Sequence, residues 1–242
     1  MSHIHLPDGV LPFWLWISGF IVAILLGTIL SRFTKREDLT KRLPLLGMMA
    51  AAMVLGASVE IVPIAYHVNL TVISGILLGP SLIFLGTFVV NVILALFGHG
   101  GITVIGLNTL TLSIEGIFGY VFFRLFWKIL RRLTPATFLA TFLALLLSTF
   151  SMIGVVGLGT SHYEEMMHQE GKGIFEFNLL KEKGDPHQTR VAEKEVDLNR
   201  FMAIVIPLGF IGWVLEGVIT VLISRYIHQL RPDLLRLEKE TV

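Results

Sequence analysis

The chain lacks cysteine altogether and carries little charge. With no cysteine among its 242 residues, it can form neither disulfide bonds nor thiolate metal ligands. Charged residues make up only 15% of the chain, whereas soluble domains usually contain about 25%. The formal net charge is +1, so bulk electrostatics give no indication of a nucleic-acid partner. Any metal that the protein binds is therefore expected to be held by nitrogen and oxygen atoms.

Three sequence patterns typical of enzymes are missing as well. The chain contains no GxxxxGK followed by Ser or Thr, so it cannot itself bind ATP through a P-loop. It contains no HExxH motif of a zinc-protease helix. No Ser/His/Asp arrangement of a hydrolase stands out either. We therefore expect a protein that is not an enzyme.

What the chain has in abundance is apolar sequence. Hydrophobic residues make up 54% of it, and its mean hydropathy is +0.76. A single globular core cannot bury so much apolar surface, so the lipid bilayer must be its solvent. The apolar runs cover residues 12–31, 44–63, 70–98, 103–127, 135–158 and 201–224. They predict an all-α, multi-pass bundle of about seven transmembrane helices in the cell membrane, with residues 1–242 forming a single membrane domain.

One of these runs contains a break. Gly79 and Pro80 divide the run 70–98 into a short segment and a full helix that begins at Ser81. The short segment has fewer than the roughly 17 residues that a straight crossing needs. We therefore expect it to be broken or partly re-entrant, and the count of seven includes it.

The positive charges predict the orientation of the bundle. Lysine and arginine concentrate in three short segments at 32–42, 128–132 and 225–239. Such segments usually stay in the cytoplasm, and placing all three there requires seven crossings. The N-terminus is then outside the cell and the C-terminus in the cytoplasm.

Residues 161–200 differ from the rest of the chain. This stretch is polar and rich in glutamate, and it joins the last two spans on the outer side of the membrane. A solvated extracytoplasmic loop is the simplest interpretation. A docking surface or a metal-attracting lid is the alternative, because the stretch also carries His162, His168 and His187.

The first nine residues, Met-Ser-His-Ile-His-Leu-Pro-Asp-Gly, carry the main functional signal. A free amine, nearby amide nitrogens and an imidazole can surround a small divalent ion in near-planar nitrogen ligation. This geometry suits Ni²⁺ or Cu²⁺ and, with one more ligand, Co²⁺. The candidate donors are Met1, Ser2, His3 and His5. The alternative is a frayed polar terminus with two incidental histidines.

Three acidic residues lie in or beside the apolar spans: Glu60, Glu115 and Glu216. Ionisable groups at membrane depth are costly, and they usually face a cavity or a partner. The simplest interpretation is that these three are buried acids that form hydrogen bonds between helices.

Two histidines, His67 and His99, fall near the outer ends of their spans in the predicted topology. The N-terminus is expected on the same side. Either these are interfacial histidines bonded to the backbone, or the terminal segment folds back between the helices to meet them. In the second case, the terminal amine, His3 or His5, and His67 form one metal site at the outer face.

The order of several short motifs resembles a known family. The opening His5-Leu-Pro-Asp-Gly-Val-Leu-Pro12 is similar to the start of the CbiM/NikM proteins, the substrate-binding membrane components of cobalt and nickel energy-coupling-factor transporters. The similarity continues through His67, the stretches 75–80, 99–103 and 106–109, and Glu216-Gly-Val-Ile-Thr220. It covers most of the chain except the loop 161–200.

The resemblance implies seven helices and an N-terminus that lies outside and inserts into the bundle. It implies a metal ion near the outer face, held by the terminal amine, the amide and imidazole of a histidine at the second position, and a histidine after the second helix. The last of these corresponds to His67. Residues that could hold the ligands in place, because a ligating imidazole needs its other nitrogen fixed, are Asp8, His99, Thr103 and Asn108.

The N-terminal ligand set differs from the family pattern. A gapless match places the family histidine on His5, with three additional residues before it. If Met1 is removed, Ser2 becomes the first residue and His3 the second. Alternatively, Met1, Ser2 and His3 supply the amine, two amides and an imidazole, and His67 or His5 is added.

The resemblance also implies a function, namely that the chain binds Ni²⁺ or Co²⁺ at the outer face and delivers it across the membrane in an ATP-driven uptake transporter. The expected partners are a coupling transmembrane protein and two ATP-binding cassette ATPases, which hydrolyse the ATP. The assembly can also include a small accessory membrane subunit. Two other classes stay open. One is a secondary cation transporter that uses Glu60, Glu115 and Glu216, and the other is a membrane scaffold that transports nothing.

Overall fold

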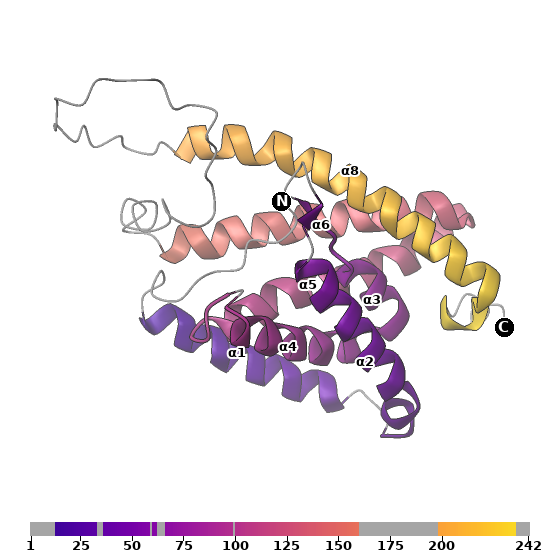
Figure 1. Ribbon diagram of the computed structural model, residues 1–242, viewed down its shortest axis with the longest axis horizontal. Helices are drawn as coiled ribbons and strands as arrows, with labels where there is room; N and C mark the ends of the chain where they lie inside the picture. Colours follow the sequence, from indigo (N-terminus) through magenta and orange to yellow (C-terminus); the bar gives the residue numbers. More distant parts are fainter. Residues whose placement is uncertain are drawn as a thin grey trace.

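The structure is a bundle of α-helices. A computed structural model describes residues 13–32, 36–58, 60–61, 66–98, 100–159 and 198–235. The helices are α1 (Phe13–Arg32), α2 (Arg36–Ser58), α3 (Thr71–Leu78), α4 (Pro80–Leu96), α5 (Ile105–Leu130), α6 (Leu133–Gly159) and α8 (Leu198–Leu230). The remaining elements are the antiparallel strands β1 (Glu60–Ile61) and β2 (Tyr66–His67) and the 3-10 helix η3 (Pro232–Leu235). These elements, drawn in Figure 1, confirm the all-α prediction for the described residues.

The outside of the bundle is apolar, as a membrane protein requires. Four helices in the described part are long and apolar enough to cross a bilayer, namely α1, α5, the 133–155 part of α6 and the 209–230 part of α8. Helix α4 is apolar but shorter, at 17 residues. Large hydrophobic side chains such as Ile24, Ile129 and Leu222 are more than half exposed on these helices. Lipid can pack against such faces, and the chain is a multi-pass membrane protein.

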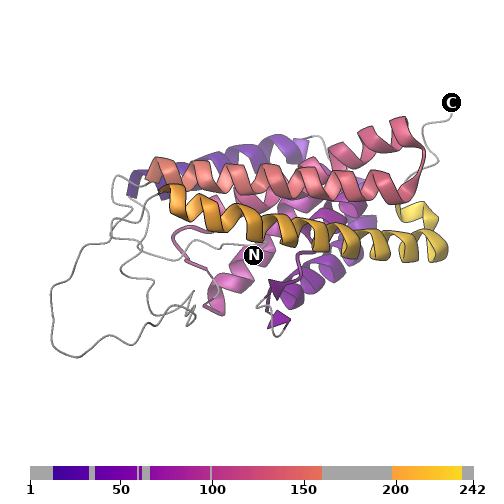
Figure 2. The ribbon, with the colours of Figure 1, turned by 90° about the horizontal axis from the view of Figure 1, so that it is seen from above.

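Helix α5 is the centre of the bundle. It packs against α1, α3, α4 and α6, while α8 packs along α6 and also contacts α3 and η3. Figures 1 and 2 show that α1, α5 and α8 all finish at one end of the bundle. Basic residues follow each of these helices, so we call this the basic end. The clustering agrees with the charge pattern on which the predicted orientation depends, and the orientation itself stays a prediction.

Helix α3 has only half the length of a span. Its eight residues extend about 12 Å along the helix axis, whereas the bilayer core is about 30 Å thick. Its C-terminal end lies near the basic end, because the Arg42 side chain, close to the start of α2, donates a 3.4 Å hydrogen bond to the carbonyl of Leu77. The predicted break is confirmed at Gly79, whose φ of 83° is readily adopted only by glycine.

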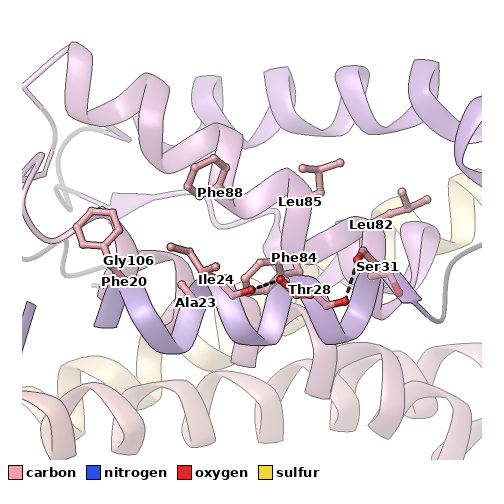
Figure 3. Close-up of a pocket in the computed structure, with 12 residues that line it drawn as sticks. Phe20, Ala23, Ile24, Thr28, Ser31, Leu82, Phe84, Leu85, Phe88 and Gly106 are labelled. Carbon is pink, nitrogen blue, oxygen red and sulfur yellow. Dashed lines mark hydrogen bonds between the residues drawn. The ribbon is translucent and has the colours of Figure 1, made fainter. Parts of the chain in front are cut away.

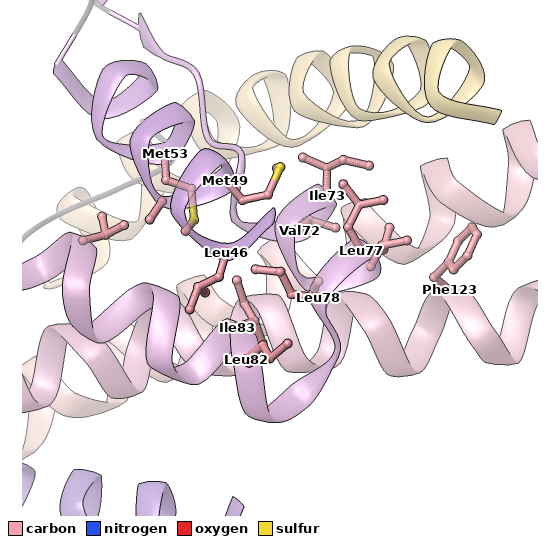
Figure 4. Close-up of a cluster of buried hydrophobic side chains, with 14 of the residues drawn as sticks. Leu46, Met49, Met53, Val72, Ile73, Leu77, Leu78, Leu82, Ile83 and Phe123 are labelled. Carbon is pink, nitrogen blue, oxygen red and sulfur yellow. The ribbon is translucent and has the colours of Figure 1, made fainter. Parts of the chain in front are cut away.

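The main apolar core surrounds α3, and Figure 4 shows side chains that α2, α3, α4 and α5 contribute to it. The labelled side chains are Leu46, Met49 and Met53 of α2, Val72, Ile73, Leu77 and Leu78 of α3, Leu82 and Ile83 of α4, and Phe123 of α5. Every residue of α3 is buried. Helix α3 is therefore an internal helix enclosed by protein.

Glycines let α3 approach α5 closely. A Cβ at Gly75 would lie 2.0 Å from the carbonyl oxygen of Gly116, and a Cβ at Gly119 would lie 2.9 Å from Val72. No rotamer change relieves the first clash, because the obstacle is backbone. The two helices can therefore pack at this distance only because Gly75 carries no side chain.

We predict that Gly75→Ala forces α3 away from α5 and lowers the free energy of unfolding by at least about 2 kcal/mol. Thermal unfolding of the purified protein in detergent measures this loss. Gly47→Ala is the matched control, because nothing lies within 4 Å of a Cβ at that position and alanine favours a helix over glycine. An unchanged midpoint for Gly75→Ala would contradict the close packing.

Candidate functional site

A buried asparagine joins three parts of the bundle. Asn69, directly before α3, has no exposed surface. Its Nδ2 donates a short hydrogen bond to Oε1 of Glu115 in α5. Its backbone N–H donates to Oε2 of Glu216 in α8 at 3.1 Å, and its Oδ1 accepts a 2.8 Å bond from the N–H of Thr71. The side chain of Asn69 thus accepts a hydrogen bond from the first amide of α3 while it donates to an acid of α5.

The two acids fix where α3 begins. Glu115 and Glu216 stand near the middle of α5 and α8, and both are almost fully buried. Their bonds to Asn69 place the start of α3 near the middle of the bundle. Non-helical backbone is tolerated at such depth only where protein or a water-filled cavity surrounds it and its polar groups are paired. The bond from the Thr71 N–H to Asn69 meets that requirement for the first amide of α3.

Glu115 and Glu216 are buried, hydrogen-bonded acids, which confirms the interpretation for two of the three glutamates. Ser148 of α6 is within hydrogen-bonding reach of the Glu115 side chain, and the two carboxylates are near enough to influence each other electrostatically. Four elements therefore converge here: the segment before α3, and helices α5, α6 and α8. The side chain of Glu60 lies outside the described residues.

His67 lies just before this cluster. In β2 it pairs with Glu60 of β1 across the antiparallel ladder, and its side chain is half-buried. Two residues of extended chain span at most about 7 Å, so the backbone of His67 is that close to the backbone of Asn69. Helix α3 leads from Asn69 toward the basic end, whereas His67 precedes Asn69 on the chain. The N-terminus is predicted on the side of the bundle opposite the basic end.

Most of the other predicted site residues lie outside the part of the chain that the structure describes. Met1, Ser2, His3, His5, Asp8 and His99 lie outside the described residues, as does nearly all of the loop 161–200. Asn108 is buried in the first turn of α5, and Thr103 is half-buried just before that helix. Both precede Glu115 on the chain, and Asn108 lies about 10 Å from it along the helix axis. Within the described ranges, no three His, Cys, Asp or Glu residues come together as a metal site.

A second set of buried polar side chains connects α4 and α5. The hydroxyls of Thr87 and Ser113 are 2.7 Å apart, and Nδ2 of Asn91 donates to the carbonyl of Thr87 at 2.9 Å. Nδ2 of Asn91 is also 3.4 Å from the hydroxyl of Thr109. These groups satisfy one another, so they are best understood as interhelical hydrogen bonds.

A groove lies elsewhere, between α1 and α4. It has a volume of about 640 Å³, and Figure 3 shows that its walls are mainly apolar, with Phe20 and Ile24 on α1 and Phe84 and Phe88 on α4. Two of its hydroxyl groups, those of Thr28 and Ser81, donate to backbone carbonyls. A groove with this lining suits an acyl chain better than a metal ion.

Asn69 is the functional residue that sequence reasoning missed. It lies between the apolar runs 44–63 and 70–98, where only His67 was singled out. A signal was present, because an asparagine side chain commonly accepts a hydrogen bond from the backbone N–H two residues later. Its two long-range bonds to Glu115 and Glu216 have no local sequence signature.

Comparisons with known proteins agree with this architecture. Residues 5–234 match the family described as CbiM, cobalt uptake substrate-specific transmembrane region. A solved structure of a truncated transition metal transporter superimposes with a TM-score of 0.63 over 94% of this chain and 99% of that chain. The sequence identity is 18%, so this likeness shows the fold alone.

Three relatives extend the comparison. The cobalt transport protein CbiM of Geobacter sulfurreducens is 30% identical over 96% of this chain, which spans 61% of that protein's length. The cobalt transport protein CbiM of Sorangium cellulosum is 31% identical over 96% of this chain and 94% of its own length. A putative fused cobalt transport protein CbiMQ of Methanocorpusculum labreanum is 27% identical over 95% of this chain, which spans 36% of that longer protein.

We predict that Asn69→Asp destabilises the protein by about 2 to 4 kcal/mol, because it replaces the donor to Glu115 with a third acid. The double variant Asn69→Asp with Glu115→Gln exchanges donor and acceptor, so it should recover much of the loss. Thermal unfolding of the wild type, both single variants and the double variant gives the coupling between the two positions. Additive effects would contradict the bond between them.

Proposed function

We propose that this chain, which belongs to the CbiM family of cobalt uptake substrate-specific transmembrane regions, captures Co²⁺ or Ni²⁺ at the outer face of the membrane. It would then deliver the ion as the substrate-specific component of an ATP-driven uptake transporter. The metal ion is cargo in this proposal, and no other cofactor is needed in the chain.

The observation that carries the proposal is the position of His67. The cluster of Asn69, Glu115 and Glu216 holds the chain inside the bundle. His67 lies two residues before Asn69 on the chain. The pairing of His67 with Glu60 in a short ladder supports this role, because a ladder that holds the backbone would preorganise the imidazole as a ligand. The predicted N-terminal donors are expected on the same side.

The remaining ligands would come from the first residues. The terminal amine, amide nitrogens and the imidazole of His3 or His5 provide the nitrogen ligation that Ni²⁺ and Co²⁺ accept. Deprotonation of these groups accompanies metal binding, so affinity should fall as the pH is lowered. The two arrangements, with Met1 retained or removed, stay open. Asp8, His99, Thr103 and Asn108 are proposed to position the terminal segment.

Energy would come from other chains. The sequence holds no P-loop, so ATP binding is assigned to two partner ATPases that act through a coupling transmembrane protein. The name of the fused relative, CbiMQ, supports association with a further transport subunit. A small accessory membrane subunit is compatible with this assembly. ATP-driven reorientation of the chain would then expose the ion to the cytoplasm.

One observation favours a second candidate. Two carboxylates side by side in the middle of a membrane bundle are typical of proteins that bind and move cations by themselves. Glu115 and Glu216 fit that description, so a secondary cation transporter is the alternative. In that case, the ion would pass between these acids, and no ATPase would be required.

We predict about one Co²⁺ or Ni²⁺ per chain in the untagged protein, and an affinity at least about 100-fold lower after His67→Ala. Blocking the N-terminal amine should have a similar effect. Isothermal titration and metal analysis measure both, and mass spectrometry shows whether Met1 remains. His228→Ala is the matched control, because this histidine is exposed in the last turn of α8. Equal binding by all variants would place the site elsewhere.

Transport assays separate the two candidates. In liposomes, the chain alone should take up no metal, and uptake should require ATP together with the partner subunits. Glu216→Gln should then weaken the fold more than it changes metal affinity. Uptake by the chain alone, driven by a proton gradient and abolished by Glu216→Gln, would contradict the ATP-driven mechanism and establish the alternative.

A further inference from the structure

Three hydroxyl groups are buried without a hydrogen-bond partner among the described residues. They belong to Thr137 of α6 and to Thr220 and Ser224 of α8. Each of these residues has no exposed surface. A buried polar group that forms no hydrogen bond costs free energy, so such groups usually contact a bound water molecule or ion.

These hydroxyls differ from others in the same bundle. In helices, Ser and Thr commonly donate to the carbonyl of the preceding turn. Thr111, Thr141 and Thr149 do so, with distances of 2.9 to 3.0 Å. Thr137, Thr220 and Ser224 do not, although the preceding turn is equally available to them. Their hydroxyls therefore remain available for a molecule between the helices.

The three residues lie along one interface. Helices α6 and α8 run side by side in both views (Figures 1 and 2). A Cβ at Gly217 would lie 2.8 Å from the ring of Phe138, so the backbone of α8 lies against α6 at that level. Thr137 is the neighbour of Phe138 in the sequence, and Thr220 lies less than one turn after Gly217. Both residues therefore lie at the same level of the contact between α6 and α8.

Polar residues on α8 form a stripe that starts at the carboxylate cluster and leads to the basic end. Glu216, Thr220 and Ser224 are each four residues apart, so they share one face of the helix. On α6, Ser148, which reaches Glu115, is followed toward the basic end by Thr141 and Thr137. The two stripes thus connect the acids in the middle of the bundle with the end where Arg225 follows Ser224.

The spacing along α8 matches that of bridging water. Four residues of an α-helix rise about 6 Å, and two hydrogen bonds of about 2.8 Å in sequence cover about 5.6 Å. One water molecule can therefore bridge Glu216 to Thr220, and another Thr220 to Ser224. A single ion could not contact groups spread over about 12 Å, and neutral hydroxyls are poor ligands for Co²⁺ or Ni²⁺.

We propose that Thr137, Thr220 and Ser224 bind ordered water in a narrow track between α6 and α8, which connects Glu216 with the basic end of the bundle. The proposal goes beyond the transport function and does not rest on it, since it holds whichever metal is carried. It assigns the α6–α8 interface as the hydrated part of the bundle, through which the buried acids exchange water with the cytoplasmic side. The ligand of the three hydroxyls is water.

The absence of native cysteine makes a direct test available. Single variants Thr137→Cys, Thr220→Cys and Ser224→Cys place a thiol of similar size in the track. Ag⁺ is small and travels only through water, and it replaces the thiol proton to form a silver–sulfur bond. Thiols left unreacted are then counted with a fluorescent maleimide after denaturation. Ala140→Cys is the matched control, because Ala140 is equally buried in α6 within the apolar core.

With full-length protein in inside-out membrane vesicles, the three track thiols should react with Ag⁺ at least about 10-fold faster than the thiol at position 140. In right-side-out vesicles this difference should disappear. Rates no faster than that of Ala140→Cys would overturn the track, and faster reaction from the outer face would overturn its direction. Monodisperse elution in detergent confirms that each variant is folded.

A second pair of variants needs no cysteine. Thr220→Val keeps the shape of the side chain but removes the hydroxyl, whereas Thr220→Ser keeps the hydroxyl. If the hydroxyl binds water, the unfolding temperature of Thr220→Val should lie below that of Thr220→Ser. If the interface is dry, the valine variant should be the more stable of the two, because an unsatisfied hydroxyl has been removed. That result would overturn the proposal.

Discussion

The hydrogen bonds of Asn69 determine how the bundle is arranged around α3. One asparagine, buried before a short helix, donates to an acid of α5 and, through its backbone, to an acid of α8. Buried carboxylates are costly unless they are hydrogen-bonded, and the amides that begin a helix are costly unless they are paired. Here Asn69 provides a donor to each acid and an acceptor for the first amide of α3. The segment before α3 is thereby held in the middle of a membrane bundle.

Several features follow from that position. Helix α3 covers only the distance from the bundle centre to the basic end, so eight residues are sufficient. It is enclosed on all sides, so it must pack closely against α5, which Gly75 and Gly116 allow. It must then reverse into α4, which Gly79 allows with its positive φ. The other side of the Asn69 cluster is left to β1, β2 and His67, where the proposed metal site lies.

The sequence predicted the helices better than it predicted the site. Long apolar runs identify spans because the bilayer imposes their length, and the Gly79-Pro80 break was visible for the same reason. Helix α2 begins at Arg36, before the predicted apolar run, because charged residues outside the bilayer can remain helical. Glu115 and Glu216 stood out as acids among apolar residues. Their common partner, Asn69, did not stand out, because contacts between distant segments leave no local pattern.

We propose that the metal ion binds beside His67 and not between the two acids. Anomalous X-ray diffraction at the cobalt edge, from crystals of the untagged protein grown with Co²⁺, distinguishes these two positions. We expect one strong peak within coordination distance of the His67 imidazole, and density for the terminal amine beside it. A peak between Glu115 and Glu216, with none at His67, would contradict it and would favour a cation path through the carboxylates.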